Sequence, residues 1–351
     1  MLKIGIIGTG GMANHHATSL KEMDGVRLAA CCDVRQDSAQ AFAAKYGIPG
    51  VYTDYRQMLA TEKLDGVLNV TPDAVHCEVA LAVLEAGVGI LSEKPMATTL
   101  DDARRMLAAA EKAGVVNMIN FSYRNSTALQ HAARVVQDGG IGRVIHIESS
   151  YLQSWLVATS WGDWREKPGL TWRLSTGHGS GGVLGDLGCH IYDLTALLCG
   201  EIAEIDCRLK TFDKGIPGNK LGEYLLDAND SFASTITLKN GAVGVVHSSR
   251  WAVGHANSLR ARVYGDKGGI EIDLDRAYDE YRICAGQAAI DEFKWETVKC
   301  EPTPSNHARF LTALRTGKND ASDFANGVRV QAYLDASFRS AEENGPVAVA
   351  G

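Results

Sequence analysis

The first 120 residues alternate between short apolar runs and stretches with helical periodicity. Because helices cover both faces of such a sheet, its strands are almost continuously apolar, and the pattern predicts a doubly wound parallel α/β sheet. The expected strands are Lys3–Gly8, Val26–Cys32, Gly66–Val70, Val88–Ser92 and Val115–Asn120. The expected helices between them are Met12–Met23, Gln36–Tyr46, Asp73–Ala86 and Thr99–Ala113.

Beyond residue 120 the pattern changes to one helix followed mainly by strands. A helix is expected at Asn125–Gln137 and a strand at Arg143–Gln153. Further strands are expected at Ile205–Thr211, Ser231–Leu238, Gly244–Ser249, Leu259–Tyr264 and Gly269–Leu274, and closing helices at Asn306–Arg315 and Phe324–Asn344. A length of 351 residues suggests two domains. We predict a boundary that separates residues 1–121 from residues 122–351.

A glycine-rich turn joins the first strand to the first helix. Its sequence, Gly8-Thr9-Gly10-Gly11-Met12-Ala13, fits the G-x-G-x-x-A fingerprint, and Asp33 follows Ala13 by 20 residues at the end of the second strand. Glycines let the backbone approach a pyrophosphate, and the helix N-terminus offers free N–H groups to it. This context predicts a dinucleotide site that includes Gly8, Thr9, Gly10, Gly11 and Met12.

The residues after the second strand bear on the choice between NAD and NADP. Asp33 should accept hydrogen bonds from the ribose hydroxyls, and its charge would repel a 2′-phosphate. Arg35, two residues on, could instead accommodate that phosphate or lie over the adenine. NAD is therefore favoured over NADP, with Asp33, Val34 and Arg35 at the site.

Two further segments contain candidate catalytic residues. Glu93-Lys94-Pro95 follows the fourth expected strand, at the edge of the sheet where ligands bind. A glycine-rich stretch leads into an expected helix at Val183–Leu198, on which Asp186, His190 and Asp193 would share one face. Such a polar face is costly to bury unless its groups are paired.

With these motifs in place, the sequence resembles the glucose–fructose oxidoreductase / inositol dehydrogenase / MocA family over essentially its whole length. The motifs that carry the resemblance are Gly8–Ala13, Asp33, Asn69-Val70-Thr71-Pro72 with His76, Glu93-Lys94-Pro95, the segment Gly181–Asp193 and the turn Val263–Gly269. The resemblance implies a Rossmann domain and a C-terminal α/β domain whose open, mostly antiparallel sheet often makes subunit contacts. A homo-oligomer, a dimer or tetramer, is expected.

The resemblance also implies reversible hydride transfer between a nicotinamide and a hydroxyl carbon. In our hypothesis His190 is the general base, Asp186 orients it, and Lys94 donates to the reacting oxygen. Whether Lys94 or His190 is the principal acid/base stays open. Residues implied to line the cofactor path are Thr71, Pro72, Glu93, Lys94 and Asn120. His15, His16 and His76 are interpreted as surface or packed histidines.

The substrate is only partly indicated. Four tryptophans lie between residues 155 and 172, with arginines among them. This segment could be a loop that covers a bound sugar, or an aromatic loop that packs in its own core. The substrate-binding candidates are Lys94, Tyr123, Arg124, Trp172, Arg173, His178, Asp186, His190 and Tyr192. A sugar, sugar acid or cyclitol fits these polar groups. The alternatives are a glycosidase with transient redox chemistry and a dinucleotide-binding sensor without activity.

Composition and charge exclude other classes. The 35 basic against 42 acidic residues give a net charge of −7, which argues against a nucleic-acid partner. No apolar run is long enough to span a membrane, and the start is too short for a signal peptide. The eight cysteines lack metal-like or CxxC spacing, so we propose no metal and expect a cytoplasmic protein with free thiols.

Overall fold

The computed structural model describes residues 1–351 apart from the side chain of Pro168. The chain divides into two compact units, which we call unit 1 (residues 1–121 and 304–331) and unit 2 (residues 122–303 and 332–351). The predicted boundary assigned all of residues 122–351 to the second domain, whereas residues 304–331 belong to unit 1. The reason is apolar packing, because Phe310 and Leu311 belong to the same buried cluster as Ile4 and Leu68.

Unit 1 contains a six-stranded parallel sheet in the order β3-β2-β1-β4-β5-β6. This is the strand order of a doubly wound dinucleotide-binding fold, which reverses direction between β1 and β4. The strands are β1 (Leu2–Ile7), β2 (Val26–Cys32), β3 (Gly50–Tyr52), β4 (Gly66–Asn69), β5 (Gly89–Ser92) and β6 (Asn117–Ile119). The predicted parallel α/β sheet is confirmed.

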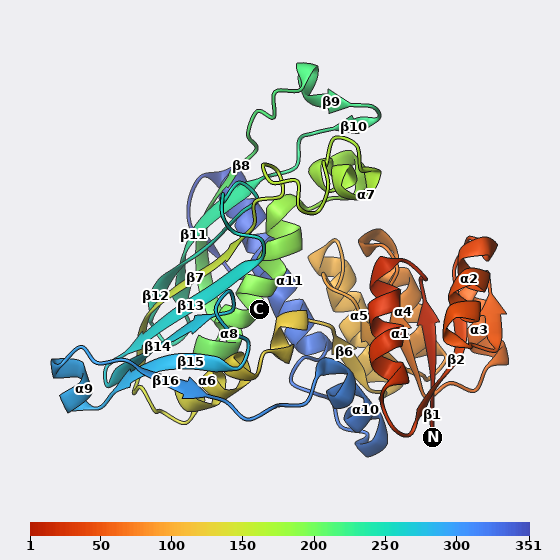
Figure 1. Ribbon diagram of the computed structural model, residues 1–351, viewed down its shortest axis with the longest axis horizontal. Helices are drawn as coiled ribbons and strands as arrows, with labels where there is room; N and C mark the ends of the chain where they lie inside the picture. Colours follow the sequence, from red (N-terminus) through yellow and green to blue (C-terminus); the bar gives the residue numbers. More distant parts are fainter. The chain divides into compact units, whose positions relative to one another are not determined.

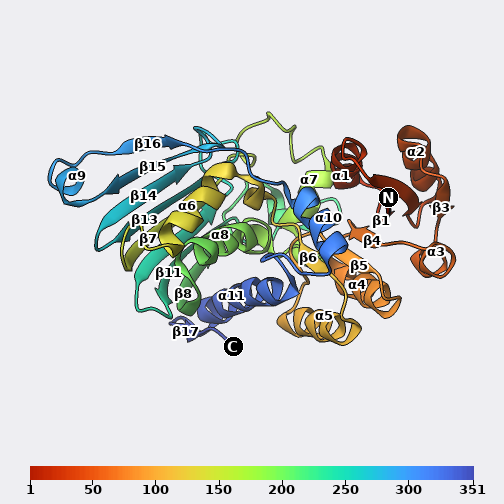
Figure 2. The ribbon, with the colours of Figure 1, turned by 90° about the horizontal axis from the view of Figure 1, so that it is seen from below.

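Helices cover both faces of this sheet, with α1, α2 and α10 on one face and α3, α4 and α5 on the other (Figures 1 and 2). The helices are α1 (Gly11–Lys21), α2 (Gln36–Tyr46), α3 (Tyr55–Thr61), α4 (His76–Glu85), α5 (Leu100–Ala113) and α10 (Asn306–Thr316). Sequence signals determine their ends. For α5, the Thr99 hydroxyl accepts a hydrogen bond from the Asp102 N–H, and Gly114 ends the helix in the left-handed conformation.

Unit 2 is built on a nine-stranded sheet in the order β16-β15-β14-β13-β7-β12-β11-β8-β17. All neighbouring strands are antiparallel except β7 and β12, which are parallel. This confirms the mostly antiparallel second sheet. The strands are β7 (Val144–Leu152), β8 (Ile202–Lys210), β11 (Ser231–Leu238), β12 (Val243–Ser249), β13 (Ser258–Gly265), β14 (Gly268–Asp273), β15 (Glu280–Ala285), β16 (Glu296–Lys299) and β17 (Val347–Ala348).

Two helices of unit 2, α6 (Thr127–Gln137) and α8 (Cys189–Cys199), lie on one face of this sheet (Figure 2). The short elements of unit 2 are α7 (Pro168–Thr171), β9 (Lys220–Leu221), β10 (Tyr224–Leu225) and α9 (Gln287–Asp291). The last long helix, α11 (Phe324–Glu343), contributes residues to both units. None of the described helices is long and apolar enough to cross a membrane.

The helix expected at Val183–Leu198 is not a uniform α-helix. Leu184–Gly188 form a π-helical turn, and α8 begins after it at Cys189. Asp186 therefore lies in the π-helical turn and His190 in the α-helix. π-Helical turns are rare in proteins, and those that occur are often found at functional sites.

A buried ion pair stabilises the loop after β8. Lys214 Nζ lies 2.6 Å from Asp230 Oδ2, and both side chains are fully buried. The same carboxylate oxygen accepts the Phe212 N–H at 2.8 Å. Removal of one partner from such a pair leaves a buried charge without its counter-ion.

We predict that Lys214→Met lowers the free energy of unfolding by about 3–5 kcal/mol, because Asp230 is then buried without a cation. Lys239→Met is the matched control, since Lys239 forms an exposed pair of the same length, 2.6 Å, with Glu201. Exposed pairs contribute about 1 kcal/mol or less. Urea denaturation measures both variants, and equal losses would contradict the prediction.

Candidate active site

The carboxyl edge of the unit 1 sheet gathers the residues that directly follow each strand. Gly8, Asp33, Val70, Glu93 and Asn120 each donate their backbone N–H to a residue of the neighbouring strand, so they form one row along this edge. Ligands of open parallel sheets bind at this edge, where the strand order reverses. The row includes four of the predicted cofactor-binding positions.

The glycine turn between β1 and α1 has the shape that a dinucleotide requires. Gly8 adopts a φ of +89°, and a Cβ there would lie 2.4 Å from the Val70 carbonyl oxygen. At Gly10 and Gly11 a Cβ would meet no atom within 4 Å, so these positions border open space. That space is a cavity of about 760 Å³, lined by Gly8 to Met12, Cys32 to Arg35, Thr53, Tyr55, Val70 to Pro72, Val75, Glu78 and Val79.

The Asp33 carboxylate is held firmly at one side of this cavity. Its Oδ2 accepts the Thr9 N–H at 2.9 Å and the Thr9 hydroxyl at 2.8 Å, and its Oδ1 accepts the Arg35 N–H at 3.0 Å. Partial burial alone would raise the pKa of Asp33, but these hydrogen bonds outweigh it and lower the pKa. A negative charge therefore persists at neutral pH beside the glycine turn.

Glu93 and Lys94 lie at the same edge, directly after β5. Glu93 is 9% exposed. Its Oε1 accepts Asn120 Nδ2 at 2.6 Å and lies 2.8 Å from His16 Nε2, while its Oε2 accepts the Lys94 N–H at 3.2 Å. Burial opposes ionisation, but the hydrogen bond and charge of His16, then Asn120 and Lys94, lower the pKa of Glu93 to about 2.

The structure buries two of the three histidines that were interpreted as surface or packed. His16 on α1 is buried, and its Nδ1 lies 2.8 Å from Nε2 of the buried His307 on α10. His76 is also buried, with Nδ1 at 2.8 Å from the Pro95 carbonyl oxygen and Nε2 at 2.9 Å from that of Thr71. Both histidines are therefore packed, which was one of the two interpretations. His16 also bonds to Glu93, and His76 bonds to the backbone of Pro95 and Thr71, so both contact segments with predicted site residues.

His307 titrates abnormally because it is buried in this cluster. Loss of solvation, followed by repulsion from His16 and His15, lowers the pKa of His307 to about 4. The ring is therefore neutral at neutral pH. A single sequence gives no signal for this pairing, since His16 and His307 are 291 residues apart.

In unit 2, the predicted catalytic His190 lies among aromatic rings. Its ring centroid is 5.0 Å from that of Tyr123 and 6.0 Å from that of Tyr151. The Tyr123 hydroxyl donates to the Tyr151 hydroxyl at 2.6 Å, the Tyr151 hydroxyl donates to Asn257 Oδ1, and Asn257 Nδ2 donates back to Tyr123 at 2.6 Å. Gln153 Nε2 adds bonds to Tyr151 and Asn257.

This closed loop of hydrogen bonds holds a neutral phenol beside His190. Burial, then the neighbouring Tyr123 and the charge of Asp186, raise the pKa of Tyr151 well above its ordinary value. Tyr123 was a predicted substrate residue, whereas Tyr151 and Asn257 were missed. Their spacing of about a hundred residues hides their contact in the sequence.

Asp186 is held by an arginine that the sequence did not single out. Arg250 is fully buried, and its NH2 lies 3.0 Å from Asp186 Oδ2, while NH1 donates to the Arg173 carbonyl at 3.0 Å. The guanidinium also lies 5.0 Å from the Trp155 ring centroid. Arg173 Nε lies 3.9 Å from the same Asp186 oxygen.

The other predicted substrate residues separate into buried and accessible ones. Arg124 is 4% exposed, and its NH2 and Nε reach the two Asp193 oxygens at 2.6 and 2.8 Å, so its fork is occupied inside unit 2. Tyr192 is fully buried and bonds to Ser234 and Ser337, a core position that does not support substrate contact.

The accessible residues lie in the irregular segment before the π-helical turn. The Arg173 guanidinium lies 4.8 Å from the Trp172 ring centroid. The exposed His178 ring is 4.4 Å from that of Tyr224, and its Nδ1 is 3.0 Å from the Ser175 hydroxyl. These side chains remain candidates for substrate contact.

The fold of unit 1, its glycine turn and its anionic Asp33 define a dinucleotide-binding protein. Comparison with known families agrees: residues 2–121 match the model described as "Oxidoreductase family, NAD-binding Rossmann fold", and residues 129–271 match the GFO/IDH/MocA C-terminal domain. The chain belongs to this family of oxidoreductases, which confirms the resemblance seen in the sequence.

Characterised relatives cover most of the chain. The levoglucosan dehydrogenase of Pseudarthrobacter phenanthrenivorans is 27% identical, over 97% of this chain and 96% of its own. The D-glucoside 3-dehydrogenase of Escherichia coli is 31% identical, over 69% of this chain and 68% of its own. The solved structure of levoglucosan dehydrogenase with NADH and levoglucosan superposes with a TM-score of 0.89, at 26% identity and full coverage of both chains.

We predict that His307 makes stability fall as the pH drops from about 6.5 to about 4. In this window the unfolded chain binds a proton at this histidine and the folded protein does not, so the free energy of unfolding decreases. His307→Gln removes the titration and should flatten that part of the profile of thermal midpoints against pH.

His131→Gln, in unit 2, is the control and should keep the wild-type slope. Glu93 affects the same profile at lower pH. Its pKa is lowered from 4.5 to about 2 in the folded protein, so the stability that its ionised form provides is lost as the pH falls from about 4.5 to about 2. Identical slopes of the thermal midpoint against pH for wild type and His307→Gln above pH 4 would contradict the prediction.

Proposed function

We propose that this protein is an NAD-dependent dehydrogenase that transfers a hydride between the nicotinamide and a hydroxyl carbon of a sugar, sugar acid or cyclitol. The observation that carries the proposal is the shared edge of the unit 1 sheet. This edge holds both the glycine turn with Asp33 and the Glu93-Lys94 corner. The names of the relatives, which act on levoglucosan and a glucoside, support the substrate class.

Three side chains handle the proton in this proposal. When NAD is bound, its nicotinamide supplies the hydride acceptor, so the protein must remove the hydroxyl proton. His190 takes this proton as general base, and Asp186, held by Arg250, orients the ring or the sugar hydroxyl. Lys94 donates to the reacting oxygen and stabilises the developing alkoxide charge.

We also propose that NAD is preferred to NADP. Asp33 keeps its charge at neutral pH, and its carboxylate lies beside the turn where the adenosine ribose would bind. The side chain of Arg35 is 70% exposed and its Nε is 3.9 Å from Asp33, too weak a pair to cancel that charge. The preference should appear as a lower KM for NAD.

The test is NADH formation by purified protein with inositols, aldoses, sugar acids and aryl glycosides, with NAD and NADP in parallel. We expect net NADH from one polyol class. Lys94→Ala and His190→Ala should each lower kcat by at least about 100-fold, the usual contribution of a positioned acid or base.

The outcomes separate the proposal from its competitors. Near-wild-type turnover in both variants would refute the assigned roles, and an NADP preference of about tenfold or more would refute the role of Asp33. Glycoside cleavage without net NADH would replace the dehydrogenase with a redox-assisted glycosidase. Tight NAD binding with no product from any substrate would favour a sensor.

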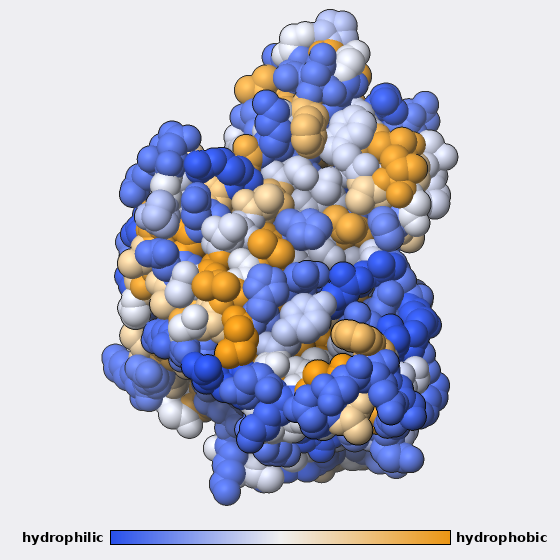
Figure 3. All heavy atoms as spheres, turned by 90° about the vertical axis from the view of Figure 1, so that its left-hand side faces the viewer, coloured by the Kyte–Doolittle hydropathy of each residue, from blue (hydrophilic) through white to orange (hydrophobic). Residues whose placement is uncertain are grey.

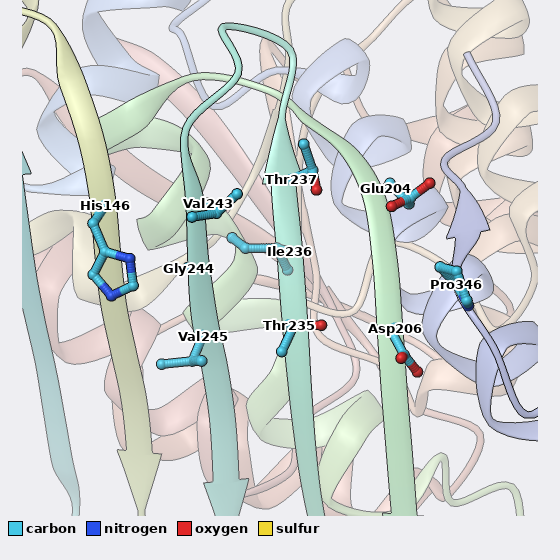
Figure 4. Close-up of a pocket in the computed structure, with 10 residues that line it drawn as sticks. All are labelled: His146, Glu204, Asp206, Thr235, Ile236, Thr237, Val243, Gly244, Val245 and Pro346. Carbon is cyan, nitrogen blue, oxygen red and sulfur yellow. The ribbon is translucent and has the colours of Figure 1, made fainter.

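We further propose that the protein forms a homo-oligomer through the outer face of the unit 2 sheet. On this face Val243 and Val245 are 50% and 37% exposed. Figure 4 shows Val243 and Val245 beside Thr235 and Thr237 of β11, along a groove of about 380 Å³ that reaches β8 and Pro346, the residue before β17. Figure 3 shows hydrophobic residues among hydrophilic ones on the face turned to the viewer.

The oligomer is tested by light scattering after size exclusion. The double variant Val243→Lys/Val245→Lys places charges in the expected interface and should yield monomers. Val253→Lys, at a residue 74% exposed outside the sheet, should leave the oligomer intact. A wild-type protein that is monomeric at about 50 μM, within the range of transient association, would contradict the proposal.

The cysteines support a reducing compartment for this protein, which we propose to be the cytoplasm. All eight are free thiols, and seven of them are buried. Burial raises the pKa of Cys31 to about 11 and that of Cys32 to about 12, so both stay protonated and unreactive.

A further inference from the structure

Glu93 receives hydrogen bonds from three separate segments of unit 1. His16 comes from α1, Asn120 from the end of β6, and the Lys94 N–H from the turn after β5. Asn120 is itself held, since its Oδ1 accepts Asn306 Nδ2 of α10 at 2.7 Å. One carboxylate therefore joins the dinucleotide-binding helix to the two strand ends that carry Lys94 and Asn120.

The directions of these hydrogen bonds follow from the charges. Glu93 is ionised at working pH, so its oxygens only accept, and His16 Nε2 must donate to Oε1. The other nitrogen of His16, Nδ1, faces His307 Nε2. The two nitrogens lie 2.8 Å apart, so one of them donates the hydrogen bond that joins the two rings.

His307 thus limits His16 to one orientation. A lone histidine can flip its ring, which puts a ring carbon in the place of each nitrogen. A flipped His16 would therefore present C–H groups to both Glu93 and His307 and lose both hydrogen bonds. Both rings are at most 4% exposed, so water cannot replace the lost partners.

A third buried histidine holds the other side of Lys94. His76 Nδ1 bonds to the carbonyl oxygen of Pro95, the residue after Lys94, and its Nε2 bonds to the carbonyl oxygen of Thr71 in the predicted cofactor loop. Lys94 itself is half-buried. Its backbone is therefore anchored through Glu93 on one side and through Pro95 on the other.

We propose that the His16–His307 pair is a positioning device for Lys94, which acts by holding the Glu93 carboxylate in one place. The inference rests on the proposed function only in that Lys94 is taken to meet the reacting oxygen. His16 and His307 touch no substrate in this account. They determine where the Lys94 backbone and the Asn120 amide point, and His76 completes the anchor from the opposite side.

The first test compares variants of His16. In His16→Ala the Glu93 carboxylate loses its donor from α1, so kcat should fall at least about tenfold, while the Kd for NADH, measured by fluorescence, changes less than about threefold. Each tenfold change corresponds to about 1.4 kcal/mol of differential interaction. His16→Gln keeps an amide donor that can reach Glu93, and should recover most of kcat.

The matched control is His15→Ala. His15 precedes His16 on α1 and is exposed. Its ring centroid lies 6.1 Å from that of His16 and 6.2 Å from that of His307. It should leave kcat and the Kd for NADH unchanged. A merely structural role of His16 would lower the thermal midpoint of His16→Ala without changing kcat, and that result would overturn the proposal.

A second readout needs no substrate. The Lys94 N–H is protected by its bond to Glu93 Oε2, so hydrogen exchange in a peptide covering residues 93–97 should accelerate at least about tenfold in His16→Ala and not in His15→Ala. Unchanged exchange would overturn the positioning role. Faster exchange in a protein that oxidises no polyol would keep the anchor and reject the proposed function.

Discussion

A buried carboxylate stays ionised only if the protein itself provides the hydrogen bonds that water would supply, and Glu93 meets this requirement at the functional edge of unit 1. Its donors come from α1, from the end of β6 and from the Lys94 turn. The glycine turn at the start of α1 and the Lys94 corner after β5 are therefore not independent features. A displacement of α1 would disturb the carboxylate and, through it, the orientation of Lys94.

In unit 2, the buried polar groups beside His190 are also satisfied by hydrogen bonds within the protein, but these groups are neutral rather than charged. The loop of hydrogen bonds among Tyr123, Tyr151 and Asn257 gives each hydroxyl a donor and an acceptor, so the buried polar atoms are satisfied. The charge of Asp186 is balanced by the buried Arg250. Each side chain with a proposed chemical role is thus supported by others that hold it in place.

Much of the fold follows from local patterns in the sequence. The alternation of apolar runs and helices predicts the parallel sheet, and the fingerprint Gly8–Ala13 with Asp33 predicts its nucleotide edge. β3 was not predicted because three residues are too few to show a period. The second-domain boundary was predicted without residues 304–331, whose place in unit 1 depends on the packing of Phe310 and Leu311.

The candidate site is less predictable, because its supporting contacts join distant residues. Neither the pairing of His16 with His307 nor that of Asp186 with Arg250 leaves a local signal. Burial also reverses some expectations, since Arg124 and Tyr192 look suited to a substrate but bond within unit 2. A sequence thus indicates which residues carry the chemistry more readily than which residues hold them.

The most direct measurement follows the hydrogen itself. A polyol that the protein oxidises would be deuterated at the carbinol carbon and incubated with NAD, and the reduced cofactor would be analysed by mass spectrometry. Direct hydride transfer predicts NADH that is one mass unit heavier, with no deuterium lost to water. Unlabelled NADH, or a product formed without any reduced cofactor, would contradict the account.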